Sequence, residues 1–161
     1  MLKNLNKIII ILLFLLIFYE KIDYKIHNYV IDNIYLKDTN NRLNYLGFVE
    51  IDRLNIRREI VYGINDFNLL NHVTLSEKSK SLKSDNIILA GHAIKNIFLN
   101  LKDIKINDEI KIISDKVRYY EVYDILIVNK ANVGVIDNSD LILITCKNND
   151  ERIIVKANKK R

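Results

Sequence analysis

The chain of 161 residues fits one compact domain with a short appendage, because single domains most often contain about 100 to 150 residues. Apolar residues make up 49% and charged residues 28% of the chain, a balance that excludes a wholly disordered protein. The net charge of +5 is spread among both signs, which argues against a nucleic-acid-binding protein. The single cysteine excludes an intramolecular disulfide and a multi-cysteine metal site.

The N-terminal segment contains an uninterrupted apolar run, residues 8–19, preceded by two lysines. As a helix this run covers about 18 Å, short of the roughly 30 Å hydrocarbon core, so flanking residues or local bilayer thinning must contribute. Its length also suits a signal peptide, but residues 18–22 offer no small residues for cleavage. Residues 1–23 are therefore predicted to be an uncleaved signal anchor; the alternative, a buried helix of a soluble domain, would need complete enclosure.

The flanking lysines predict a single-pass protein of the cell membrane, with its N-terminus in the cytoplasm and the remainder outside. Residues 24–45 mix polar and aromatic side chains, with apolar residues at a rough helical spacing. This segment is predicted to be a juxtamembrane helix or linker.

The remainder of the chain, residues 46–161, contains short segments rich in Ile and Val that are typical of β-strands. They are residues 48–54, 56–62, 86–90, 109–114, 117–129, 141–146 and 152–157. Short helices are expected at residues 66–71 and 94–101, and Asp115-Lys116 is expected to form a hairpin turn. So many strands with little helix between them predict an antiparallel barrel or sandwich, since parallel strands need crossover connections.

Three groups with reactive or charged side chains fall at the ends of predicted strands: His92, Cys146 and Arg152. Each alone has an ordinary structural explanation, because a lone cysteine after apolar residues is usually a small core residue. Together they supply a nucleophile, a proton-transfer partner and a cation for thiol acyl transfer. An unperturbed cysteine has a pKa of about 8.5, so a nearby histidine or arginine must favour the thiolate or accept the proton.

The spacing of these residues adds a geometric expectation. Arg152 lies six residues after Cys146, the span of a tight loop between adjacent antiparallel strands, so its guanidinium could face the sulfur across the pair. Histidine can also protonate a leaving amine, which makes His92 the candidate acid/base. His27, near the predicted anchor, and His72, in a predicted polar loop, have no comparable setting.

Three motifs resemble those of sortases, in the same order: Ile-Ile-Leu-Ala-Gly-His at 87–92, Leu-Ile-Thr-Cys at 143–146 and Arg-Ile-Ile-Val at 152–155. The resemblance extends from about residue 46 to residue 157. It implies an all-β domain over residues 46–161, a closed barrel of about eight strands with one or two short helices.

The resemblance also implies a function. In that family a cysteine outside the cell attacks the Thr-Gly bond of a Leu-Pro-x-Thr-Gly-like C-terminal sorting signal. An amine from a cell-wall precursor or a pilin lysine then resolves the thioester. By matching position, Cys146 is the nucleophile, His92 the acid/base and Arg152 the oxyanion or substrate-backbone partner, while Thr145 helps to hold the oxyanion. No cofactor is implied, and the compact chain is expected to be a housekeeping or class D-like enzyme.

Two alternatives stay open at this point. The first is a hydrolytic cysteine peptidase, although such enzymes usually place cysteine before histidine and on a helix. The second is a membrane-tethered, non-catalytic β-domain that binds a wall polymer or a partner protein. Calcium dependence is not expected, because Asp137 and Asp140 fit turn residues better than metal ligands.

Overall fold

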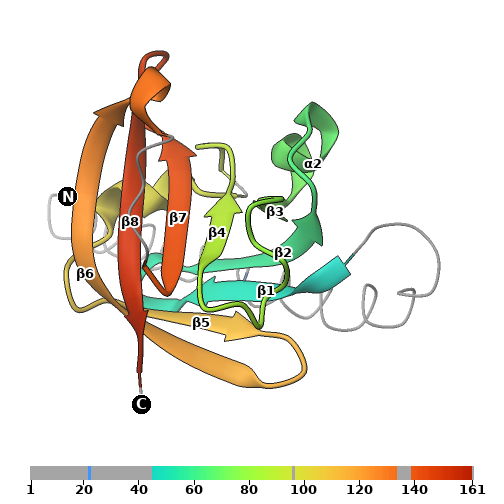
Figure 1. Ribbon diagram of the computed structural model, residues 1–161. Helices are drawn as coiled ribbons and strands as arrows, with labels where there is room; N and C mark the ends of the chain where they lie inside the picture. The colour runs from blue at the N-terminus through green and yellow to red at the C-terminus, as the bar shows by residue number, and fades with distance from the viewer. Residues whose placement is uncertain (1–21, 23–44, 96, 134–138, 161) are drawn as a thin grey trace, which may run out of the picture. The chain divides into compact units, whose positions relative to one another are not determined.

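The computed structural model describes residues 22, 45–95, 97–133 and 139–160. In this part of the chain eight strands close a barrel in the order β1-β2-β3-β4-β7-β8-β6-β5 (Figure 1). The strands are β1 Tyr45–Ile51, β2 Ile56–Tyr62, β3 Val73–Leu75, β4 Ile87–Ala90, β5 Glu109–Ile113, β6 Val117–Asn129, β7 Leu141–Cys146 and β8 Glu151–Lys159. The closed all-β barrel implied by the resemblance is thereby confirmed.

Helices are short in the described part of the chain. They are the α-helix α2 (Asp66–Asn71) and the 3-10 helices η2 (Asp52–Leu54), η3 (Leu99–Asp103) and η4 (Lys130–Asn132). Asn65 caps α2 by accepting a hydrogen bond from the Asn68 amide at 2.9 Å, as short polar side chains commonly do. The predicted helix at 66–71 is confirmed, whereas the helix expected at 94–101 is replaced by turns that lead into η3.

Several predictions concern the N-terminal segment and cannot be followed in the structure. The predicted anchor (1–23) and linker (24–45) lie outside the described residues except for Ile22 and Tyr45, and so does His27. Within the residues that are described, no helix combines the length and the apolar character needed to cross a bilayer.

The all-antiparallel arrangement predicted from the sequence was wrong, because two strand pairings are parallel. β2 runs parallel to β3, and β4 runs parallel to β7. α2 forms a short crossover between β2 and β3, while the antiparallel β5–β6 hairpin lies in the long connection from β4 to β7. A parallel pair needs only a long enough return path, which need not be a helix.

Strand boundaries differ most from the predictions at β3 and β1, and the ends of β4, β5 and β8 differ by one or two residues. The three-residue strand β3 was missed, since so short a segment shows no alternation. The first strand begins at Tyr45 and ends at Ile51, and η2 occupies the predicted end of it. The predicted hairpin turn is confirmed: the Ser114 amide donates to the Lys116 carbonyl between β5 and β6.

The two faces of β7 divide the core from the outer surface of the barrel. Leu141 and Leu143 belong to the buried core cluster, together with Val155 of β8. Alternate residues of a strand point to opposite faces, so Ile144 and Cys146 lie on the outer face. The candidate nucleophile is therefore presented by the outside of the barrel wall.

Candidate active site

Cys146 ends β7 directly opposite Arg152, near the start of β8. Directly opposed residues of an antiparallel pair lie on the same face with their Cβ atoms about 4.5–5.5 Å apart. The guanidinium and the thiol therefore share one surface, and the predicted register is confirmed. Cys146 is partly exposed, so a substrate can reach its sulfur.

Carbonyl groups in and next to the β7–β8 loop, residues 147–150, bind the Arg152 guanidinium. Nη1 of Arg152 donates to the Asn148 carbonyl at 3.1 Å and to the Glu151 carbonyl at 3.0 Å. Asn148 belongs to the short turn predicted from the spacing of Cys146 and Arg152, and Glu151 is the first residue of β8. The cation is thus tied to the same hairpin that carries the thiol.

His92 reaches this surface because β4 lies beside β7. Ala90 pairs with Ile144 in the parallel ladder, and the Gly91 amide donates to the Ile144 carbonyl at 3.1 Å. The chain therefore continues past the end of β4 alongside the last residues of β7. His92 follows immediately and is partly exposed.

Packing beneath the histidine fixes the path of its backbone. The Phe98 amide donates to the His92 carbonyl at 3.0 Å, and Phe98 is fully buried. A Cβ atom at Gly91 would lie 2.7 Å from Phe98 Cδ2 and 2.8 Å from Ile97 Cγ2. Only glycine allows this close approach without displacing the two side chains.

Thr145 joins the nucleophile strand to the histidine loop. Its hydroxyl donates to the Gly91 carbonyl at 2.9 Å, and only 2% of the residue is exposed. A hydroxyl has a single proton to donate, and here that proton goes to the Gly91 carbonyl. The geometry thus gives Thr145 a positioning contact, and its part in holding an oxyanion stays a prediction.

These side chains surround one cavity of about 170 Å³. It is lined by Leu69, Ala90, Gly91, His92, Ile144, Thr145, Cys146 and Arg152. The structure therefore brings together every residue that the sequence singled out for catalysis. It adds an apolar wall to which Leu69 of α2 contributes, and no motif or spacing in the sequence pointed to that residue.

His72 has an environment that the sequence did not indicate. His72 lies in the bend between α2 and β3, which agrees with the predicted loop, but only 7% of the residue is exposed. Its Nδ1 lies 3.3 Å from Oε2 of Glu59, which is also buried. Buried polar groups need such partners, and His72 is not among the residues that line the cavity.

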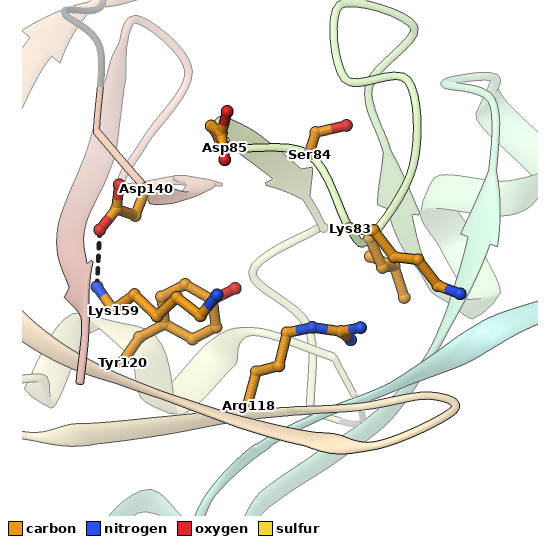
Figure 2. Close-up of a pocket in the computed structure, with 8 residues that line it drawn as sticks. Lys83, Ser84, Asp85, Arg118, Tyr120, Asp140 and Lys159 are labelled. Atoms are coloured by element: carbon orange, nitrogen blue, oxygen red, sulfur yellow. Dashed lines mark hydrogen bonds between the residues drawn. The ribbon is translucent and has the colours of Figure 1, made fainter. Parts of the chain in front are cut away.

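A second cavity, of about 40 Å³, lies beside β6 where β4 and β7 begin and β8 ends (Figure 2). Its walls are mostly charged and polar: they comprise Leu82, Lys83, Ser84, Asp85, Arg118, Tyr120, Asp140 and Lys159. Burial raises the pKa of the Tyr120 hydroxyl, and the Asp140 carboxylate accepts the Lys159 amide at 2.8 Å. This cavity has no thiol or imidazole in its wall, so it offers nothing for acyl transfer.

Asp140 behaves as the sequence suggested for a turn residue, and Asp137 lies outside the described residues. Across the described ranges, no group of three or more His, Cys, Asp or Glu side chains is placed to hold a metal ion. No part of the thiol chemistry outlined above requires one.

Residues 49–160 match the family model of the Sortase domain. Sortase A from Corynebacterium diphtheriae, as a lid mutant, has a similar structure, with a TM-score of 0.69 and 21% identity over 78% of this chain and 75% of that chain. Sortase C1 from Streptococcus agalactiae gives a TM-score of 0.68 and 21% identity, covering 76% of this chain and 70% of its own.

Sortase C from Clostridium perfringens SM101 gives a TM-score of 0.65 and 25% identity, covering 76% of this chain and 73% of that one. A comparison with curated proteins finds no match. At these sequence identities the solved structures indicate a shared barrel fold. The family model covers the segment that contains His92, Cys146 and Arg152.

Proposed function

Because this chain belongs to the sortase family of cysteine transpeptidases, we propose that it cleaves a C-terminal sorting signal and transfers the protein to an amine. The signal is of the Leu-Pro-x-Thr-Gly kind, and the amine belongs to a cell-wall precursor or a pilin. The observation that supports this most strongly is the single cavity shared by Cys146, His92 and Arg152.

The first half of the proposed reaction forms a thioester. The Cys146 thiolate attacks the threonine carbonyl carbon, and a sulfur–carbon bond forms as the carbonyl oxygen gains negative charge. Arg152, held opposite Cys146, stabilises that oxyanion or the adjacent substrate backbone. The carbon–nitrogen bond then breaks, and His92 gives a proton to the departing glycine amine.

The second half transfers the acyl group. The acceptor amine attacks the thioester carbonyl, His92 accepts a proton from that amine, and the sulfur leaves as thiolate. The apolar wall formed by Leu69, Ala90 and Ile144 suits a substrate that presents aliphatic side chains beside its scissile bond. Such a wall also keeps part of the site free of water, which favours the amine over hydrolysis.

The proposal also includes the location of the enzyme at the cell membrane. Residues 1–23 would anchor the chain in the cell membrane with the catalytic domain outside, because their apolar run is flanked by lysines on its N-terminal side. We also propose that the chain is a class D-like sortase. The similar structures named above are sortases of classes A and C.

Intact-mass spectrometry tests the proposal directly. The full chain in detergent, incubated with a panel of Leu-Pro-x-Thr-Gly peptides and an amine acceptor, should gain the mass of the acyl fragment and then release an amine-linked product. Cys146→Ala should show neither. Product that contains only the hydrolysed acid, whatever amine is added, would indicate a cysteine peptidase. No adduct at all on folded protein would indicate an atypical sorting signal first and a binding domain second.

A further inference from the structure

The β7–β8 loop is organised by one exposed side chain, that of Asn148. Its Oδ1 accepts the Asp150 amide at 2.9 Å and the Glu151 amide at 2.8 Å, and its Nδ2 donates to Glu151 Oε2 at 2.7 Å. An asparagine that binds backbone amides two and three residues ahead mimics a backbone turn and closes it. All three contacts lie within the hairpin, so this side chain shapes the turn.

The same loop controls Arg152 through backbone atoms. Nη1 of Arg152 donates to the carbonyls of Asn148 and Glu151, the residues whose relative position the Asn148 side chain fixes. The Lys147 amide donates to the Glu151 carbonyl at 3.0 Å and completes the turn. The direction of the guanidinium therefore depends on the shape of the loop.

Glu151 is the one carboxylate of the hairpin that stands next to Arg152 in the sequence. Lys147 Nζ and Asn148 Nδ2 both bind its Oε2, at 3.1 and 2.7 Å, and together they hold the pKa of this carboxyl below its ordinary value. The Glu151 carboxylate thus already has two partners within the hairpin. Arg152 itself lines the cavity in which Cys146 lies.

We propose that Asn148 is a positioning residue: its side chain fixes the turn whose carbonyls hold the Arg152 guanidinium opposite Cys146. This rests on the proposed function, in which Arg152 stabilises the oxyanion or the substrate backbone. An arginine side chain loses considerable rotamer entropy when it is ordered. A turn that orders it beforehand lowers the barrier of the chemical step more than it improves substrate binding.

The test compares Asn148→Ala with Asn149→Ala in the full chain. Asn149 is the exposed neighbour, and it contacts Lys130 through its backbone carbonyl, which the substitution keeps. We expect Asn148→Ala to lower kcat for transpeptidation about 10-fold and to change KM less than about threefold, since one misplaced donor costs less than the 10²-fold or more of a removed donor. Asn149→Ala should stay within about twofold of wild type.

Two further variants separate positioning from folding. If Asn148 acts through Arg152, Asn148→Ala should cause little additional loss in an Arg152→Lys background, because contacts in one pathway are not additive. Asn148→Asp keeps the acceptor for the two amides but loses the donor to Glu151, so its kcat should fall between wild type and Asn148→Ala. Equal losses from Asn148→Ala in both backgrounds would overturn the proposal.

A measurement that needs no catalysis keeps the inference separate from the proposed function. The heteronuclear NOE of the Arg152 Nε–Hε group should fall in Asn148→Ala and stay unchanged in Asn149→Ala. This result would support the positioning role even if no peptide acylates the wild-type protein, in which case only the proposed function fails. An unchanged NOE in Asn148→Ala would overturn the positioning role even in an active enzyme.

Discussion

The loop after β4, which carries His92, is held by buried packing and backbone hydrogen bonds, whereas the β7–β8 loop beside Cys146 is held by exposed polar side chains. Gly91 packs against Phe98 with no room for a Cβ atom, while Asn148 reaches its partners in solvent. Buried contacts lose more when disturbed, because the surrounding side chains cannot relax freely. Substitutions in the loop that carries His92 should therefore reduce activity more than substitutions in the β7–β8 loop.

The largest effect is expected from Gly91→Ala, which disturbs the packing of the loop that carries His92. The added methyl group meets Phe98 and Ile97, so the loop must move outward and carry His92 with it. A displacement of about 1 Å at a catalytic group can cost about 100-fold in rate, and overpacking costs about 1–3 kcal/mol in the free energy of unfolding. Transpeptidation kinetics and urea denaturation measure the two effects.

A compensating substitution provides the control. Gly91→Ala combined with Phe98→Leu has more space beneath the loop, so it should recover a substantial part of the activity that Gly91→Ala loses. Wild-type activity in Gly91→Ala alone would show that the position of the histidine does not depend on this packing.

A smaller effect is expected from Thr145→Val, which removes the hydrogen bond from β7 to the loop that carries His92. The Gly91 carbonyl then loses its hydroxyl donor, and an unsatisfied buried acceptor costs about 1–3 kcal/mol in the free energy of unfolding. We expect kcat to fall about 10-fold, because His92 keeps its other anchors. Thr145→Ser retains the hydroxyl and should stay close to wild type.

Thr74→Val is the matched control for this prediction. Thr74 is also fully buried, and its hydroxyl donates to the Ala90 carbonyl at 3.1 Å, one residue before Gly91. It should lose similar stability but less activity. A loss of 100-fold or more in kcat for Thr145→Val without a loss of stability would instead indicate that Thr145 donates to the oxyanion, as the resemblance implied.

The two loops also differ in how far the sequence could predict them. The Cys146–Arg152 register follows from a short hairpin, whose loop length limits the possible pairings. The approach of His92 to Cys146 depends on the parallel pairing of β4 with β7, two strands about 50 residues apart, and nothing in their composition specifies it. Only the order of the three motifs, compared with a known family, indicated that contact.

Burial was harder still to predict from local pattern. His72 follows the polar Asn71 and precedes Val73 in the sequence, and it lies at the C-terminal end of α2, where its ring meets Glu59 inside the domain. The Asn148 contacts were missed for the opposite reason, because asparagine is common throughout this chain and no single one stands out. Hydrogen-bond partners depend on the turn that forms, which a sequence without proline and with few glycines signals weakly.

The smallest expected effect is a response of the exposed loop to acid. The pKa of Glu151 is lowered first by Lys147 and then by Asn148, so these contacts are fully present above the ordinary value of 4.5 and are lost as the pH falls through the lower folded-state value. Between pH 6 and pH 8 the loop should therefore be unchanged. Other charges near it are those of Arg152 and of the Lys130–Asp150 pair.

Carbon-13 chemical shifts of the Glu151 carboxyl group, followed during an acid titration, measure this directly. The midpoint in wild type should lie below 4.5, the ordinary value, and Lys147→Met should move it upward, because the ammonium group is the largest cause of the shift. The amide resonances of Gly91 and Phe98 should not follow the same curve, since the loop after β4 contains no carboxyl group. A shared midpoint would show that the two loops are coupled, and the distinction between a packed loop and a polar loop would then fail.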